Sequence, residues 1–146
     1  MSAEIERRIG FAQVVEERFR QLKVVRAPDL PYDDAGIYTS LREYLQSEID
    51  PSCLAGIYSV GVGTDGIVRA LKELGIDQMQ GLVAHDFTEA HQTFLIGGEL
   101  SYVLNQDIYY CVLTAARVLR GLCENVRGAL SVVQPRVEIL TAENIH

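Results

Sequence analysis

The chain has 146 residues, of which 48% are hydrophobic and 23% are charged, a composition typical of one globular domain rather than of a disordered segment. Its 13 basic and 20 acidic residues give a formal net charge of -7, so little basic surface is available to neutralise nucleic-acid phosphates. No apolar stretch reaches the length of about 18 residues that a membrane crossing needs. We therefore expect neither a nucleic acid nor a membrane to be a partner of this chain.

Cysteine usage and the N-terminal residues bear on the cellular compartment. The three cysteines, Cys53, Cys111 and Cys123, form no CxxC pair and leave one thiol over in any pairing. The first ten residues, MSAEIERRIG, carry charges where a signal peptide has an apolar run. We therefore expect a reduced, cytoplasmic protein.

In chain order, the hydrophobic pattern alternates between helical and strand-like segments. Apolar residues at helical spacing predict five helices, at residues 2–19, 34–46, 63–74, 88–96 and 107–123. Short apolar runs predict five strands, at residues 22–25, 54–60, 81–85, 101–104 and 136–141. Ser2, Thr88 and Asp107 are placed to cap the starts of helices, and Gly75 is placed to end one.

This alternation predicts an α/β fold. Strands joined through helices by short loops form an open, parallel, doubly wound sheet flanked by helices, with right-handed crossovers. The whole chain, residues 1–146, then forms a single α/β lobe. Folds of this kind begin with a strand, whereas this chain begins with a helix. We therefore expect the first strand to be missing upstream of Met1.

The polar residues that follow the predicted strands are the candidate ligand-binding residues, because ligands of open α/β sheets bind at the carboxyl ends of the strands. Three such clusters occur, at residues 59–63, 85–86 and 105–107. Asp86 offers a bidentate acceptor, Asn105 and Gln106 offer amides, and Arg7 offers a forked donor near the start of the first helix. This mixture suits the hydroxyls of a sugar or polyol, each of which donates and accepts.

A glycine motif lies between a predicted strand and a predicted helix. Gly61, Gly63 and Gly66 form GxGxxG, and Asp86 ends the next strand 20 residues later, a spacing typical of a dinucleotide-binding site. However, Asp65 places a negative charge beside the position of the phosphate, and the fingerprint usually lies on the first strand of its fold. A glycine-rich turn that simply packs closely is the favoured interpretation.

The segment HDFTEAH contains four residue types that bind metals. His85, Asp86, Glu89 and His91 straddle a strand end and a helix start, and no further His or Cys cluster supports them. A loop capped by Thr88 is the favoured interpretation of the segment. Because neither a GxSxG motif nor a P-loop lysine is present, we expect no enzymatic activity, no metal and no cofactor.

Four segments carry a resemblance to a known family. ERRIGFAQVVEE, GIYSVGVGTDGIVRALKELG, LVAHDFTEAHQTFLIGGELSYVLNQD and the terminal VEILTAENI resemble the C-terminal lobe of the effector-binding core of a LacI/GalR-type transcriptional regulator. The similarity spans essentially the whole chain. It implies a two-lobed, type I periplasmic-binding-protein-like fold, in which sugar-like effectors bind between lobes that move about a hinge.

The resemblance also implies roles for four residues. Arg7 in RRIGF matches the arginine that binds effector hydroxyls, Asp86 in AHD matches the sugar-binding aspartate, and Gln106 in NQD matches the glutamine on the hinge side. Ser59 stands at a strand end where the family often has asparagine, and its hydroxyl has a shorter reach. The implied function is a non-catalytic lobe that contributes half of an inter-lobe cleft for a sugar or polyol effector.

This sequence departs from the family in having no N-terminal helix-turn-helix and no first lobe. We therefore expect a fragment whose host contacts DNA only through an absent N-terminal domain. The helix at 107–123 would pack on the absent lobe, and its apolar side, left exposed, predicts a homo-oligomer. Two alternatives remain open: a nicotinamide dinucleotide-binding domain of an oxidoreductase, and the sugar-binding lobe of an ABC transporter binding protein, which shares the fold.

Overall fold

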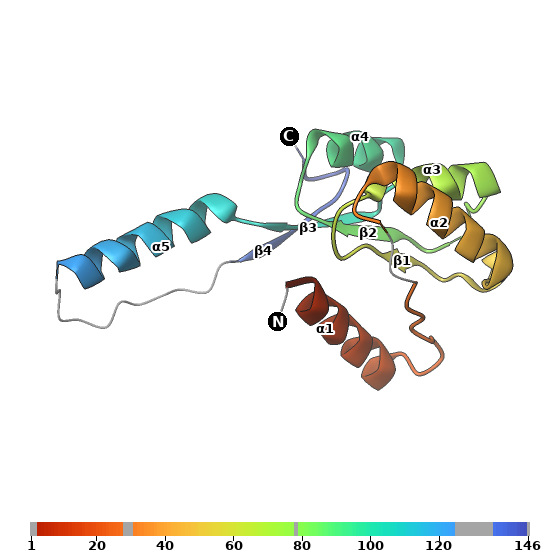
Figure 1. Ribbon diagram of the computed structural model, residues 1–146, viewed down its shortest axis with the longest axis horizontal. Coiled ribbons are helices and arrows are strands. Elements are labelled where there is room, and N and C mark those ends of the chain that lie inside the picture. The colour runs from red at the N-terminus through yellow and green to blue at the C-terminus, as the bar shows by residue number, and fades with distance from the viewer. Residues whose placement is uncertain (1–2, 28–30, 78, 125–135, 146) are drawn as a thin grey trace.

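A four-stranded sheet lies between helices in the computed structural model, which describes residues 3–27, 31–77, 79–124 and 136–145 (Figure 1). In sheet order, the strands are β1 (Ile57–Tyr58), β2 (Leu82–His85), β3 (Tyr102–Gln106) and β4 (Val137–Leu140). The helices are α1 (Ala3–Arg18), α2 (Asp34–Ser47), α3 (Thr64–Leu74), α4 (Glu89–Gly97) and α5 (Ile108–Cys123), with a short 3-10 helix at Pro51–Cys53. The predicted α/β fold, a sheet flanked by helices, is confirmed.

The sheet is mixed rather than wholly parallel. β1, β2 and β3 run parallel, with Ile57 opposite Leu82 and Val83 opposite Tyr102. β4 runs antiparallel to β3, so the prediction of an all-parallel sheet is wrong for this strand. A parallel return requires a crossover helix packed on the sheet, whereas α5 projects away from the sheet (Figure 1).

The strand predicted at residues 22–25 is also wrong. This segment follows α1 without strand pairing, and Leu22 N–H donates to the carbonyl of Phe19 in a turn at 2.8 Å. Valines favour strands only where a neighbouring strand supplies hydrogen bonds, and in the described sheet β1 pairs with β2 alone. The strand predicted at 54–60 is correspondingly short, with two paired residues.

Local capping explains where several helices begin and end. The side chains of Thr88 and Asp107 each accept a hydrogen bond from the backbone N–H of the third following residue, at 3.2 and 2.8 Å. Gly75 ends α3 with φ 64°, in the left-handed region that glycine adopts without strain. These three predicted caps are confirmed, and the cap predicted at Ser2 lies outside the described residues.

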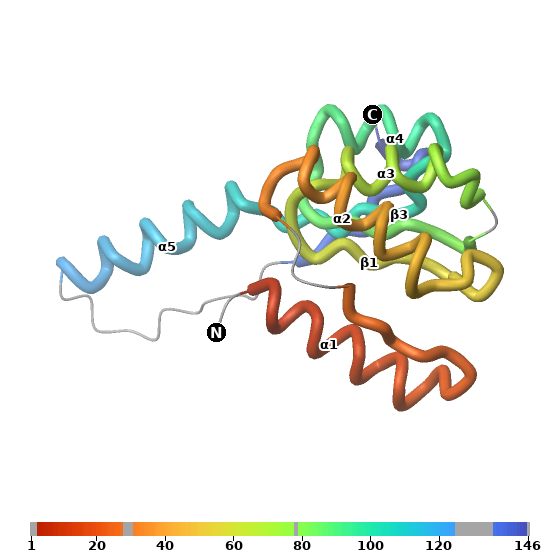
Figure 2. Tube along the Cα trace, turned by 45° about the vertical axis from the view of Figure 1, so that its right-hand side comes forward, coloured from red at the N-terminus to blue at the C-terminus, as the bar shows by residue number. Residues whose placement is uncertain are grey.

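The hydrophobic core lies on one face of the sheet, beneath the layer of α2, α3 and α4, while α1 lies on the opposite face (Figures 1 and 2). Its least exposed members come from α3, β2 and β3: Ala70, Leu82, Ala84 and Val103, each 0% exposed. α1 covers the part of its face near β1. The face of β3 and β4 is more open, and Tyr102, Val137 and Ile139 are exposed there.

α5 stands apart from the rest of the fold. Both views show it projecting from the end of β3, away from the sheet (Figures 1 and 2), and none of its residues is buried. Its exposed apolar side chains include Ile108, Val112, Leu119 and Leu122. In the described part of the chain, no helix is both long and apolar enough to cross a membrane.

Candidate functional site

An arginine and an aspartate meet at the carboxyl ends of β1 and β2. Arg7, on α1, donates a hydrogen bond from Nη1 to the carbonyl oxygen of Val60 at 3.0 Å. Its Nη2 lies 3.7 Å from Oδ2 of Asp86, the residue that follows β2. The Arg7 side chain is 17% exposed and that of Asp86 is 49% exposed. The structure therefore brings together two of the four predicted site residues.

The geometry of this pair leaves hydrogen-bonding capacity on both side chains. A guanidinium carries five N–H donors, and an ionised carboxylate carries about four acceptor sites. The separation of 3.7 Å is longer than a direct N–H···O hydrogen bond, and half of the Asp86 side chain faces solvent. A group that both accepts and donates, such as a hydroxyl, can therefore bind at the pair.

The backbone of Asp86 has an unusual conformation. Among the described residues, Asp86 is the only one other than glycine with a positive φ, 61°. Side-chain-bearing residues rarely adopt this left-handed region, although aspartate tolerates it better than most. Such conformations persist where the surroundings hold them, and they gather at functional sites. This observation adds to the case for Asp86 as a binding residue.

Two aromatic rings and a histidine lie between α1 and the sheet beside the pair. The Tyr58 hydroxyl is 2.6 Å from Nε2 of His85, and the Phe11 ring on α1 lies against the Tyr58 ring with 4.6 Å between centroids. Sequence reasoning missed Tyr58 and Phe11 as neighbours of the site. The spacing of apolar residues indicates that α1 is amphipathic, but it does not say which strands α1 covers.

Burial changes the ionisation of this cluster. The pKa of His85 is lowered mainly because burial penalises the imidazolium, and the Arg7 charge lowers it further against an opposing effect of Asp86. Burial likewise raises the pKa of Tyr58. Both groups are thus held in their neutral forms, and the Arg7–Asp86 pair supplies the charges at this end of the sheet.

A second carboxylate lies near the same edge. The hydroxyl of Tyr32 donates to Oε2 of Glu4 at 3.4 Å, and a Cβ added to Gly61 would lie 2.7 Å from Oε1 of Glu4. The first turn of α1 therefore reaches the loop that follows β1. The exposed ring of Tyr32 adds an aromatic surface to this edge.

The other two predicted site residues, Ser59 and Gln106, form no direct bond to the Arg7–Asp86 pair in the described part of the chain. Ser59 is buried, and its backbone N–H donates to the carbonyl of Val83 at 2.8 Å. Gln106 ends β3 and is partly exposed. In the described residues, no side-chain hydrogen bond or ion pair joins Ser59 or Gln106 to Arg7 or Asp86. Their roles remain predictions.

Helix α2 packs directly against Gly63 and Gly66 of the glycine motif. A Cβ on Gly63 would lie 1.9 Å from Cδ1 of Ile37, and one on Gly66 would lie 2.4 Å from the carbonyl oxygen of Asp34. The Gly66 N–H, one of the amides that a pyrophosphate would use, is 3.4 Å from the Asp34 carboxylate. The geometry thus favours close packing over dinucleotide binding.

The HDFTEAH segment holds its histidines in protein hydrogen bonds. His91 is buried, with Nδ1 2.7 Å from the carbonyl oxygen of Asp86 and Nε2 3.0 Å from the Thr64 hydroxyl. Both ring nitrogens are therefore engaged. Within residues 3–27, 31–77, 79–124 and 136–145, no three His, Cys, Asp or Glu side chains are grouped to hold a metal ion.

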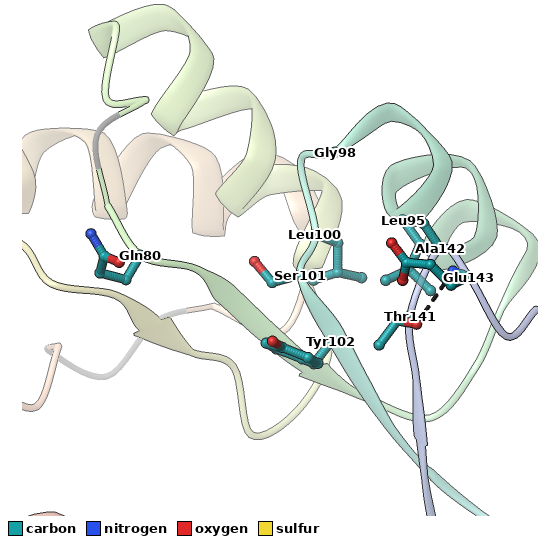
Figure 3. Close-up of a pocket in the computed structure, with 9 residues that line it drawn as sticks. All are labelled: Gln80, Leu95, Gly98, Leu100, Ser101, Tyr102, Thr141, Ala142 and Glu143. Atoms are coloured by element: carbon teal, nitrogen blue, oxygen red, sulfur yellow. Dashed lines mark hydrogen bonds between the residues drawn. The ribbon is translucent and has the colours of Figure 1, made fainter.

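A shallow cavity of about 350 Å³ lies at the opposite end of β3. Figure 3 shows Ser101 and Tyr102 on one side of it and Thr141 and Glu143 on the other. The Thr141 hydroxyl accepts a hydrogen bond from Glu143 N–H, and Ser101 Oγ accepts one from Leu82 N–H. The cavity is separate from the Arg7–Asp86 site.

Comparison with solved structures finds similar folds. A sugar ABC transporter sugar-binding protein from Bacillus halodurans matches with a TM-score of 0.75 and 19% identity, over 95% of this chain and 50% of that chain. The glucose-galactose binding protein GanP from Geobacillus stearothermophilus matches with 0.79 and 13%, over 95% and 48%. The arabinose binding protein AraP from the same organism matches with 0.75 and 17%, over 95% and 50%.

These similarities, all below 20% identity, establish the fold: that of one lobe of a type I periplasmic-binding-protein-like protein. No protein-family model and no curated protein matches the chain. The chain spans about half the length of the solved structures that it matches.

Proposed function

We propose that the chain is a non-catalytic lobe that binds a sugar or polyol and contributes half of an inter-lobe ligand cleft. The observation that carries this proposal is the Arg7–Asp86 pair at the carboxyl ends of β1 and β2. Ligands of open α/β sheets bind at that edge, and the structurally similar proteins are named as sugar-binding proteins.

The pair provides the chemistry that adjacent hydroxyls require. Asp86 accepts hydrogen bonds from hydroxyl groups through its exposed oxygen atoms, and Arg7 donates to the hydroxyl oxygens. We propose that Ser59 and Gln106 add contacts from the neighbouring strand ends. A single lobe leaves much of the ligand in water, so the affinity of this chain alone is expected to be about 1 mM or weaker.

A titration of the isotopically labelled chain tests this proposal. Glucose, galactose, arabinose and sorbitol are each added while the amide nitrogen–proton spectrum is recorded. We expect saturable shifts at the amides of residues 59–61 and 86–87 with at least one compound, weakened about tenfold by Asp86→Asn through the loss of a charged acceptor. Asparagine tolerates the left-handed backbone, so this substitution isolates the carboxylate.

Asp77 provides the matched control. It is an exposed aspartate in the segment between α3 and β2, at the opposite end of β2 from Asp86. Asp77→Asn is expected to leave the titration unchanged. Shifts that are equally weakened by both substitutions, or no saturable shift with any of the four compounds, would refute the Arg7–Asp86 site.

The host of this lobe is, in our proposal, a LacI/GalR-type transcriptional regulator in the cytoplasm. The supporting observation is three free thiols, with Cys53 and Cys123 exposed and Cys111 partly exposed, because exposed unpaired cysteines suit a reducing compartment. The native DNA upstream of the Met1 codon provides the test. An in-frame helix-turn-helix and first lobe support the regulator, whereas an in-frame signal peptide and first lobe identify a transporter's binding protein instead.

A further inference from the structure

We propose that His91 is a positioning residue of the ligand site: its ring holds the backbone of Asp86 in the left-handed turn that presents the carboxylate. This inference rests on the proposed role of Asp86 in binding a sugar or polyol. His91 itself is buried, so it acts through Asp86 rather than by touching the ligand.

Three hydrogen bonds hold the turn. The Asp86 N–H donates to the carbonyl oxygen of Leu104 on β3 at 3.1 Å. The carbonyl oxygen of Asp86 accepts from Nδ1 of His91 on α4 at 2.7 Å. The following N–H, of Phe87, donates to Oδ1 of Asn105 on β3 at 3.3 Å. The backbone groups on both sides of the strained φ of 61° are therefore bonded to neighbouring elements, which is what such a conformation needs to persist.

The His91 ring is in turn held in place. Because a carbonyl oxygen can only accept, Nδ1 carries the hydrogen in the bond to Asp86. Nε2 faces the buried hydroxyl of Thr64 at 3.0 Å, at the start of α3, and the backbone N–H of His91 donates to the Thr88 hydroxyl at 3.2 Å. The ring thus joins the starts of α3 and α4 to the end of β2, and its orientation is set by the Asp86 carbonyl oxygen and the buried Thr64 hydroxyl.

Among the hydrogen bonds at the turn, the one from His91 has the shortest distance and is the one that a side chain outside the sheet provides. Leu104 contributes a backbone carbonyl, which a substitution does not remove. Asn105 uses both ends of its amide: Oδ1 accepts from the Phe87 N–H, and Nδ2 donates to Glu138 at 3.2 Å. His91 is therefore the position at which the turn can be altered most selectively.

Two substitutions separate positioning from general stability. Asparagine at position 91 places an amide N–H near the position of Nδ1, so it keeps the hydrogen bond to Asp86 but loses the one to Thr64. Glutamine reaches the position of Nε2, so it keeps the hydrogen bond to Thr64 but loses the one to Asp86. We expect His91→Asn to retain sugar affinity within about twofold and His91→Gln to weaken it about tenfold, the effect of one lost hydrogen bond, for whichever of glucose, galactose, arabinose or sorbitol the wild type binds.

A second readout needs no ligand. The one-bond coupling between Cα and Hα of Asp86 distinguishes a positive from a negative φ. We expect the positive φ to be kept in the wild type and in His91→Asn and lost in His91→Gln, while Gln92→Ala, a substitution of the next residue on the same helix, changes nothing. A positive φ retained in His91→Gln overturns the proposal. Absence of sugar binding in the wild type contradicts the proposed function and leaves this conformational test intact.

Should His91→Gln prove too unstable for the spectrum, Asp86→Gly supplies the test. Glycine adopts a positive φ without strain, so a turn with glycine at position 86 does not need the hydrogen bond from His91 to keep its conformation. We expect His91→Gln to lower the urea midpoint of unfolding less in the Asp86→Gly background than in the wild type. An equal loss in both backgrounds assigns His91 a structural role alone and refutes positioning.

Discussion

His85 is the buried ionisable residue with the most direct consequence for behaviour in solution. Its ring lies under α1, where Tyr58 from β1, Arg7 from α1 and the adjacent Asp86 are the polar and charged groups that face it. Its pKa lies below the ordinary value of 6.5, first because of burial and then because of Arg7. The folded protein therefore resists protonation of this ring in a range where the unfolded chain accepts a proton.

We predict that the free energy of unfolding decreases as the pH falls from about 7.5 to about 5.5. In this range the unfolded state binds a proton on His85, whereas the ring stays neutral in the folded state. One such group contributes at most about 1.4 kcal/mol per pH unit. The substitution His85→Gln, which keeps a hydrogen-bonding group for the Tyr58 hydroxyl, is expected to reduce this dependence in urea unfolding curves. An identical pH dependence in both proteins would exclude His85 as its source.

The residues of the site were partly predictable from the sequence. Asp86 could be assigned to this edge because carboxyl ends of parallel strands meet there, whereas Arg7, on a helix, is a candidate through the resemblance of its motif. The structure places their side chains 3.7 Å apart. The contact between Tyr58 and His85 depends on the pairing of β1 with β2, in which Tyr58 lies opposite Val83. The contact between Phe11 and Tyr58 depends on which face α1 covers, and hydrophobic spacing reveals neither. The three bonds around Asp86 depend on backbone conformation, which composition and spacing do not reveal.

At the scale of elements, α3 packs closely against α2 because Gly66 of α3 has no side chain. A Cβ on Gly66 would lie 2.4 Å from the carbonyl oxygen of Asp34 and 3.0 Å from the backbone nitrogen of Tyr38. Both neighbours are backbone atoms of α2, so neither can turn aside. Gly10, within α1, has nothing within 4 Å of the same added atom, which makes the two glycines a matched pair.

We predict opposite signs for the two alanine substitutions. Gly66→Ala is expected to destabilise the protein by about 1–3 kcal/mol, because the helices must move apart, even though alanine favours helix. Gly10→Ala is expected to stabilise it by about 0.5–1 kcal/mol, the gain in helix propensity alone. Chemical denaturation with an unchanged m-value measures both. A stabilising Gly66→Ala would contradict the observed closeness of α2 and α3.

The elements that the sequence predicts well are those specified locally. The predicted helices at 34–46, 63–74 and 88–96 agree within one residue at each end with α2, α3 and α4, because capping residues and apolar spacing lie within each segment. The direction of β4 and the pairing of residues 22–25 depend on distant parts of the chain. A strand's partner is a property of the assembled sheet, and here α5 does not pack on the sheet to form the expected crossover (Figure 1).

At the scale of the whole molecule, α5 presents an apolar side that no other element of the described chain covers. Ile108, Val112, Leu119 and Leu122 are each 63% or more exposed and lie along one side of the helix by their spacing. Contiguous apolar surface of this kind marks a site of association. We propose that the other lobe covers this apolar side in a two-lobed host, and that a second copy of the chain covers it when the chain is isolated.

We predict that the isolated chain associates as its concentration rises, measured as an increase in mass by light scattering. The double substitution Val112→Glu with Leu119→Glu is expected to keep it monomeric. Arg117→Glu is the control, because it changes the net charge by the same -2 at an exposed position on the other side of α5. A wild type that stays monomeric at every concentration, or an Arg117→Glu variant that also loses association, would contradict this role of α5.

The position of β1 at the border of the described sheet gives Arg7 a second task. The backbone N–H of Ile57 donates to Gly81, just before β2, and that of Ser59 donates to Val83 on β2. The alternate backbone groups, at residues 58 and 60, therefore point outward. Outward-pointing strand groups invite another chain to add a strand, and proteins commonly guard them with a charged side chain. The bond from Arg7 to the carbonyl of Val60 is such a guard. The same guanidinium that lies at the proposed ligand site thus occupies a backbone group that this edge would otherwise offer to a further strand.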